Sequence, residues 1–220
     1  YTAKAEVGLT AYVRHDTDVT SRPVTFVFNG GPGSASVWLH LGLLGPVRIV
    51  MGDAAELSPP PYGVTDNAES LLEVSDLVFI DPVMTGQSRV VEGDKIDTYS
   101  GFTRDYEMVA EVIRLWTTRN GRWGSPKFLC GESYGTLRAV AVAEHLQTSM
   151  AMYLNGIMLI SSVLDFETVD FQVHRNDRAY ALYLPTYAAI AHYHGRIPDR
   201  SLGEIVADAE EYASRDYLWV

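Results

Sequence analysis

Cysteine is almost missing from this sequence, with Cys130 the single one among 220 residues. Without a second cysteine in these residues, an internal disulfide bond is excluded. Cys130 lies in an apolar run, a setting that favours a small buried residue over a reactive thiol. The histidines, carboxylates and this cysteine also lack the spacing of a metal site, so we expect no metal and no other cofactor.

Positive charge is scarce as well. Lysine and arginine number 17 against 28 aspartates and glutamates, which gives a net charge of -11. This balance argues against binding to nucleic acid or to an anionic membrane. No apolar run approaches the length that spans a membrane. An apolar fraction of 47% and a charged fraction of 20% are ordinary for a globular protein and allow one sizeable core.

A secretory signal peptide is not visible, and the chain starts at Tyr1 rather than at Met. We therefore expect that an N-terminal piece has been removed. The compartment stays open on these grounds, with secretion or a periplasmic location as the candidates.

Apolar runs and helix-like spacings alternate along most of the chain. Short apolar runs predict buried strands at residues 24–28, 77–80, 126–130 and 157–160. Apolar residues at helical spacing predict helices at about residues 34–44, 106–121 and 135–145. This alternation indicates an α/β domain with a mostly parallel sheet. Alternation over residues 7–14 predicts a half-exposed antiparallel edge strand, while residues 52–67 and 84–99 are predicted to be loops.

The pattern changes near residue 165. Residues 166–220 contain no clear buried strand, and their apolar stripe has helical spacing at Leu202, Ile205, Val206, Ala209, Tyr212 and Ala213. We therefore divide the chain into the N-terminal part of an α/β core, residues 1–165, and a helical insertion, residues 166–220. The stripe runs on to Trp219 and Val220, where the chain stops without a helix cap. We expect the chain to be incomplete and cut within this insertion.

The elbow, residues 131–135, is the stretch with the clearest chemistry. It reads Gly131-Glu132-Ser133-Tyr134-Gly135, with a predicted strand before it and a predicted helix after it. A serine hydroxyl is a poor nucleophile unless it is held exposed beside a base. A sharp strand-to-helix turn holds it so, and flanking glycines let the backbone close up. This context favours Ser133 as a nucleophile over the alternative, a serine in an ordinary turn.

A second glycine-rich turn, the 29–33 loop, reads Asn29-Gly30-Gly31-Pro32-Gly33 and again lies between a predicted strand and a predicted helix. Such a turn can bind phosphate. However, it lacks a third glycine at dinucleotide spacing and the Lys-Ser or Lys-Thr of a P-loop. The favoured interpretation is a donor of backbone N–H groups to the oxyanion of an acyl-transfer intermediate, together with the amide after Ser133.

Three segments follow one another along the chain: Asn29-Gly30-Gly31-Pro32-Gly33-Ser34-Ala35-Ser36, Asp81-Pro82-Val83-Met84-Thr85-Gly86-Gln87-Ser88 and the elbow. Together they resemble the serine carboxypeptidase family, peptidase family S10, and look most similar to its bacterial members. The match covers roughly residues 20–165. It implies an α/β-hydrolase fold, and this chain would be its N-terminal part with the start of the helical insertion, or lid, that follows the sixth strand.

The resemblance also implies roles for single residues. Ser133 would be the nucleophile, and the backbone amides of Gly31 and Tyr134 would form the oxyanion hole. The C-terminal carboxylate of a peptide substrate would be held by Asn29, the Gly30 amide and Glu132.

Three positions depart from the family pattern. Val27 stands where many members have a tryptophan, and Ser34 stands where a cysteine is common. Leu43 occupies the position of a glutamate that partners the elbow glutamate. The resemblance therefore implies a carboxylate clamp with one member missing, and a weaker discrimination for a free C-terminus.

A catalytic triad on this fold has the chain order serine, acid, histidine. Asp165 followed by His192 or His194 would provide that order within these residues. The alternative is that Asp165 caps the insertion and that both histidines lie on the surface of a helical lid. The resemblance favours the alternative, because it implies that acid and histidine lie beyond Val220.

These observations predict a serine carboxypeptidase-like hydrolase that cleaves C-terminal residues from peptides through an acyl-enzyme on Ser133. Its partners would be a peptide with a free C-terminus and the missing C-terminal segment of the same protein, without which residues 1–220 would be inactive. The same residues would also serve an acyltransferase or an esterase. A non-catalytic binding module that lacks its acid and base is the alternative from a different class.

Overall fold

The computed structural model describes residues 4–52, 56, 59–172 and 176–217. The chain divides into two compact units, Tyr1–Ser162 and Val163–Val220, and each is described by itself. Leu218, Trp219 and Val220, on which the expectation of an uncapped helix end rests, lie outside the described residues.

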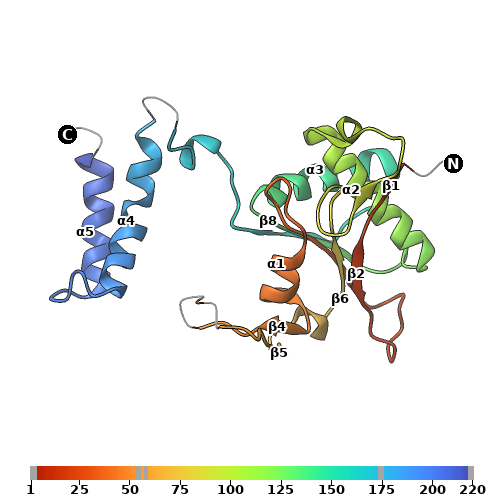
Figure 1. Cartoon of the computed structure of the whole chain (residues 1–220), viewed down its shortest axis with the longest axis horizontal. Helices are drawn as coiled ribbons and strands as arrows, with labels where there is room; N and C mark the ends of the chain where they lie inside the picture. Colours follow the sequence, from red (N-terminus) through yellow and green to blue (C-terminus); the bar gives the residue numbers. More distant parts are fainter. Residues whose placement is uncertain (1–3, 53–55, 57–58, 173–175, 218–220) are drawn as a thin grey trace. The chain divides into compact units, whose positions relative to one another are not determined.

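A five-stranded sheet forms the centre of the first unit (Figure 1). Its strands in spatial order are β2 (Leu9–Tyr12), β6 (Asp76–Ile80), β3 (Val24–Phe28), β8 (Lys127–Glu132) and β9 (Gly156–Ile160). The last four run parallel, and β2 pairs antiparallel with β6 at one edge. The predicted edge strand and the mostly parallel sheet are therefore confirmed.

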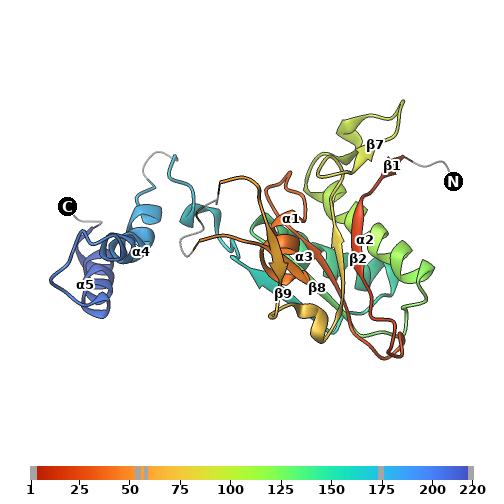
Figure 2. The same ribbon diagram turned by 60° about the horizontal axis from the view of Figure 1, so that its bottom comes forward.

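Helices cover both faces of this sheet, which explains why all five residues of β3 are buried and four of them are apolar. Figures 1 and 2 place α2 (Phe102–Arg119) and α3 (Tyr134–Met150) on one face and α1 (Val37–Leu39) on the other. Side chains of alternate residues on a strand point to opposite faces, and the two core clusters divide β3 accordingly.

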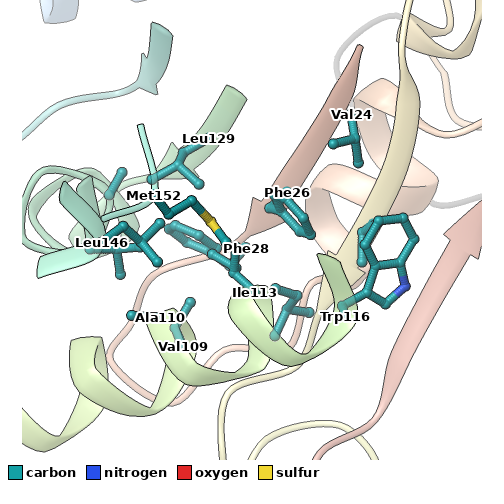
Figure 3. Close-up of a cluster of buried hydrophobic side chains, with 14 residues drawn as sticks. Val24, Phe26, Phe28, Val109, Ala110, Ile113, Trp116, Leu129, Leu146 and Met152 are labelled. Atoms are coloured by element: carbon teal, nitrogen blue, oxygen red, sulfur yellow. The ribbon is translucent and has the colours of Figure 1, made fainter. Parts of the chain in front are cut away.

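The larger core cluster lies between the sheet and the pair α2 and α3. Figure 3 shows Phe26 of β3 beside Trp116 of α2, and their rings make an edge-to-face contact at 5.5 Å. Val27, from the next position on β3, belongs to the smaller cluster on the opposite face with Leu39 and Cys130. All of these side chains are buried, so burial on both faces fixes the register of the strands that carry the site.

All three predicted helices differ from the sequence prediction in their ends, and α2 begins at Phe102 rather than at about residue 106. The first was expected from residue 34, but α1 begins at Val37 and continues as a π-helical turn, η1 (His40–Leu44), closed by the Gly45 N–H donating to the His40 carbonyl at 2.9 Å. The elbow helix was expected to end at His145, but α3 runs to Met150 because Leu146 is still on its buried face.

Three short elements, at residues 64–66, 89–90 and 96–99, lie within the segments that the sequence predicted as loops, residues 52–67 and 84–99. Antiparallel pairs join β4 (Val47–Ile49) to β5 (Val64–Asp66) and β1 (Ala5–Glu6) to β7 (Arg89–Val90). Single 3₁₀ turns form η2 (Leu71–Glu73) and η3 (Ile96–Tyr99). Strands of two or three residues without a buried face carry no periodic signal, so the plain-loop prediction was wrong there.

The second unit is helical, as its apolar stripe predicts. Its elements are η4 (Phe166–Thr168), α4 (Arg178–Tyr193) and α5 (Leu202–Arg215). Ser201 and Glu204 form a reciprocal capping box at the start of α5. Ile205 and Ala209 from the predicted stripe are buried. Among the described helices of the chain, none combines the length and the apolar character needed to cross a bilayer.

Candidate active site

The sheet brings the two glycine-rich turns together at the carboxyl ends of adjacent strands. β3 pairs in parallel with β8, and the register places Phe28 opposite Gly131. Asn29, the residue after β3, and Glu132, the last residue of β8, therefore lie side by side. In the sheet, β3 lies between β6, the next strand of this sheet along the chain, and β8, the strand that follows β6. Such a switch in strand order opens a crevice at the carboxyl ends of parallel strands, where ligands bind in open α/β sheets.

Ser133 sits between β8 and α3 in a backbone conformation that non-glycine residues rarely adopt, with φ 58° and ψ -125°. The surrounding bonds hold it there. Its N–H donates to the Ile160 carbonyl at 3.0 Å, and Thr136 donates to the Ser133 carbonyl from its N–H at 2.9 Å and its hydroxyl at 2.7 Å. Backbone strain of this kind persists where the structure over-determines it, which is common at functional sites.

Both glycines of the elbow are required by close packing of the backbone. A Cβ atom at Gly131 would overlap the Gly135 carbonyl group, and one at Gly135 would lie 2.9 Å from the Asn29 carbonyl oxygen. Any larger residue would therefore push α3 away from the ends of β8 and β3.

The 29–33 loop packs directly on the elbow. A Cβ atom at Gly30 would lie 2.6 Å from both the Tyr134 nitrogen and the Glu132 carbonyl oxygen. Gly31 has φ +103°, a region that glycine tolerates best. Among the described residues, no acceptor receives a hydrogen bond from the backbone N–H groups of Gly30, Gly31 or Tyr134.

Asn29 and Glu132, 103 positions apart in the sequence, are joined by a hydrogen bond in which Asn29 Nδ2 donates to Glu132 Oε2 at 3.0 Å. The Leu39 N–H donates to Asn29 Oδ1 at 3.1 Å. This second bond fixes the amide of a fully buried side chain, so its N–H groups face the carboxyl group. The structure thus brings together two of the three groups predicted to hold a substrate carboxylate.

An open cavity of about 490 Å³ adjoins Ser133. It is lined by Asn29, Gly31, Ser34, Trp38, Leu39, Gly42, Leu43, Glu132, Ser133 and Ile160. Leu43, the position at which a second acid was expected, lines the same cavity as Glu132. Among the described residues that line the cavity, Glu132 is the one with a carboxyl group, and none is a lysine, an arginine or a histidine.

The segment at residues 81–88, one of the three that carry the family resemblance, holds the residues that follow the 29–33 loop. Asp81, at the end of β6, accepts hydrogen bonds at Oδ1 from the Ser36 N–H at 2.8 Å and the Ser36 hydroxyl at 2.7 Å. Ser88 donates to the Asp81 carbonyl at 2.6 Å. A Cβ atom at Gly86 would overlap the Asp81 carboxylate. These contacts fasten the start of α1, and with it the residues after the loop.

Asp165, His192 and His194 belong to the second unit. Asp165 caps η4 by accepting from the Glu167 N–H at 3.0 Å, and it lies 3.4 Å from an Arg178 nitrogen. This is the capping role that the sequence left open as the alternative to a catalytic acid. Among the described residues, no histidine or carboxylate is hydrogen-bonded to the Ser133 hydroxyl.

Sequence reasoning did not identify two residues near the site, Arg138 and Asp105. Arg138 of α3 is 1% exposed, and its Nε donates to Asp105 Oδ2 of α2 at 2.8 Å. A signal was present, because Arg138 shares a helix face with Val142 and Leu146, and a charge on a buried face needs a partner.

Burial is the main cause that raises the pKa of Tyr134 to about 12, and the negative charge of Asp105 is the second cause. The Tyr134 phenol is therefore neutral at neutral pH.

Comparisons with known proteins identify the family and the fold of this chain. The model of the serine carboxypeptidase family matches residues 11–215. The pheromone-processing carboxypeptidase KEX1 of Yarrowia lipolytica is 31% identical over 149 residues, which make up 67% of this chain and 23% of that protein. Kex1(delta)p, a prohormone-processing carboxypeptidase from Saccharomyces cerevisiae, superposes with a TM-score of 0.54 at 20% identity, covering 98% of this chain and 45% of that chain.

The chain thus spans less than half the length of either relative. The structural likeness and the mostly parallel sheet with helices on both faces confirm the predicted α/β-hydrolase fold. A bacterial-type member stays a prediction, since both of these relatives come from yeasts. The family match covers most of the chain, and the chain belongs to the serine carboxypeptidase family.

Proposed function

We propose that the complete protein is a serine carboxypeptidase that removes C-terminal residues from peptides through an acyl-enzyme on Ser133. The observation that carries this proposal is the strained turn at Ser133 beside backbone N–H groups without acceptors. The Ser133 oxygen would attack the scissile carbonyl carbon while a base takes its proton. The C–N bond would then break as the proton passes to the leaving amine, and water would release the acyl group.

The oxyanion of the tetrahedral intermediate would accept hydrogen bonds from the amides of Gly31 and Tyr134. Preorganised donors of this kind are usually the largest single contribution to acyl transfer, and one donor is worth about 2.7–4 kcal/mol. The positive φ of Gly31 and the close packing at Gly30, where an added Cβ atom would lie 2.6 Å from the Tyr134 nitrogen, support this role. Tyr134 also begins α3, and the N–H groups of a first helical turn have no partner within the helix.

A substrate's C-terminal carboxylate would lie against Asn29, the Gly30 amide and Glu132. Two carboxylates repel, so a good hydrogen bond needs one proton shared between them. Binding of a free acid should therefore strengthen as the pH falls. Since Leu43 replaces a second acid, one carboxyl group carries this task, and the loss of one charge-assisted bond corresponds to about 1.5–3 kcal/mol.

The catalytic acid and base would come from a C-terminal segment of the same protein, as the resemblance implies. The share of each relative that this chain covers leaves room for such a segment, and Asp165 is engaged as a cap. Residues 1–220 alone should then react slowly with a serine-directed phosphonate. Labelling as fast as that of the complete protein would instead point to Asp165 with His192 or His194.

Substrate class is tested by comparing an N-blocked dipeptide with its C-terminal amide in the complete protein between pH 4 and 8. We expect the acid to be preferred at low pH, with the preference reduced in Glu132→Gln. Equal specificity constants at every pH, unchanged by that substitution, would refute the carboxypeptidase assignment and leave a general esterase or amidase. Transfer of the acyl group to an added alcohol in place of water would identify an acyltransferase.

A further inference from the structure

Arg138 is a buried cation close to the candidate nucleophile, and none of the roles assigned above uses it. It lies on α3 one helical turn after Tyr134, and 1% of it is exposed. A guanidinium group without partners would be very costly to bury, so its partners show what holds it and what it holds.

Its partners come from three different elements. On α2, Asp105 Oδ2 accepts from Arg138 Nε at 2.8 Å. At the end of β3, the Asn29 carbonyl accepts from Arg138 Nη1. The Tyr134 ring lies over the guanidinium carbon with its centre 5.1 Å away, within the range of a cation–π contact.

The Asn29 carbonyl lies just beyond the last pairing of β3 with β8, which joins Phe28 to Gly131. It therefore has no partner in the sheet, and among the described residues its donor is Arg138. The N–H of Gly31, the first predicted oxyanion donor, lies two residues further along the same backbone. The second predicted donor belongs to Tyr134, whose ring rests on the same guanidinium group.

We propose that Arg138 is a positioning residue that sets the distance between the two oxyanion donors. The planar guanidinium group of Arg138 would hold the backbone at the end of β3 at a fixed distance from the start of α3. Asp105 would fix the orientation of the guanidinium plane. This inference rests on the proposed function, because it assumes that the amides of Gly31 and Tyr134 bind the oxyanion. Arg138 does not touch the substrate in this account.

Arg138→Lys is the informative substitution. An ammonium group keeps the charge but lacks the planar fork, so it cannot serve Asp105, the Asn29 carbonyl and the Tyr134 ring in one geometry. A donor misplaced by about 1 Å can cost roughly a hundredfold in rate. We therefore expect kcat to fall about ten- to a hundredfold while KM changes less than about threefold, since oxyanion donors act in the transition state.

The chain offers a matched control at the opposite end of the same strands. Arg122 is also buried, and it donates to Asp76 Oδ2 at 2.6 Å and to the Arg22 carbonyl at 2.9 Å. Asp76 begins β6, and Arg22 lies shortly before β3. Arg122→Lys therefore disturbs a buried arginine with the same kinds of acceptor, far from the carboxyl ends of the strands.

The experiment measures kcat, KM and the thermal midpoint of the complete protein and its variants, with an N-blocked dipeptide well below every midpoint. The proposal predicts that both lysine variants lose thermal stability but that only Arg138→Lys loses kcat. Asp105→Asn, which keeps an oxygen acceptor for Nε, should lose a smaller part of kcat, and it provides the test if Arg138→Lys does not fold.

Two results would overturn the positioning role. The first is a normal kcat in Arg138→Lys or, if that variant does not fold, in Asp105→Asn. The second is an equal loss of kcat in Arg138→Lys and Arg122→Lys. Ser133→Ala separates this inference from the proposed function. If Ser133→Ala retains normal turnover, the proposed function itself fails. If Ser133→Ala is inactive and the two lysine variants behave alike, the positioning role alone is refuted.

Discussion

Replacing Gly30 by alanine tests how closely the 29–33 loop must fit against the elbow. The added Cβ atom would lie 2.6 Å from the Tyr134 nitrogen and 2.6 Å from the Glu132 carbonyl oxygen, whereas ordinary contacts begin at 3.4 Å. Both neighbours are backbone atoms, so no side chain can rotate away. The loop and the elbow have to separate by roughly 0.8 Å to relieve the overlap, because the repulsion is steep at such distances.

The expected consequences follow from that displacement. Overpacking of a well-packed site costs about 1–3 kcal/mol of stability, so the complete protein should still fold. The two predicted oxyanion donors, however, would move apart by a large part of an ångström, and misplacement of about 1 Å can reduce a rate roughly a hundredfold. We expect kcat/KM to fall by at least about that factor, through kcat and also through KM, since the Gly30 amide is proposed to bind the substrate carboxylate.

Gly42→Ala is the matched control. Gly42 lines the same cavity as Ser133, but a Cβ atom there would meet no heavy atom within 4 Å. The assay compares kcat/KM for an N-blocked dipeptide and the thermal midpoint in both variants of the complete protein. If Gly30→Ala keeps kcat/KM within about threefold of the parent, or if Gly42→Ala loses as much, the argument from close packing is wrong.

Two further predictions concern His40 and Cys130, which do not line the cavity at Ser133. Burial lowers the pKa of His40 below 6.5, so its contribution to stability is complete above pH 6.5 and is lost as the pH falls through the folded pKa. The urea midpoint should therefore drop below pH 6.5 in the parent and drop less in His40→Gln, and equal slopes would contradict this. Burial raises the pKa of the Cys130 thiol to about 12, so a maleimide at pH 7 should label it only in denaturant; fast labelling of the folded protein would show an accessible thiolate.

The central strands could be predicted because their environment is simple. Residues 77–80 are a continuous apolar run, residues 24–28 are apolar except for Thr25, and both lie among parallel strands covered on two faces. The antiparallel pair of β4 and β5 could not be predicted in the same way, since β5 is exposed, β4 is at most half-buried, and each strand has only three residues. His40 lies in η1, where the Tyr12 hydroxyl lies 2.8 Å from its Nε2 and its ring stacks on Phe79, two contacts that the sequence does not indicate.

Local sequence could indicate Ser133 and the glycines around it, because a strand, a tight turn and a helix follow directly in the chain. The pairing of Asn29 with Glu132 depended on the family resemblance, since it joins residues 103 positions apart. Arg138 and Asp105 were missed because an arginine on a helix is usually solvated, and the apolar face that Arg138 shares with Val142 and Leu146 does not identify its partner on a second helix. The sequence indicates which turns matter, whereas the fold determines which side chains connect them.

The most direct test of the account is whether Ser133 forms the covalent intermediate. The complete protein is treated with a serine-directed phosphonate, the modified peptide is identified by mass spectrometry, and turnover is measured in Ser133→Ala and in Ser149→Ala, a control at an exposed serine on the same helix. We predict a single label on Ser133, a loss of about a thousandfold or more in kcat for Ser133→Ala, and normal turnover for Ser149→Ala. A label on another residue, or near-normal turnover in Ser133→Ala, would contradict the account.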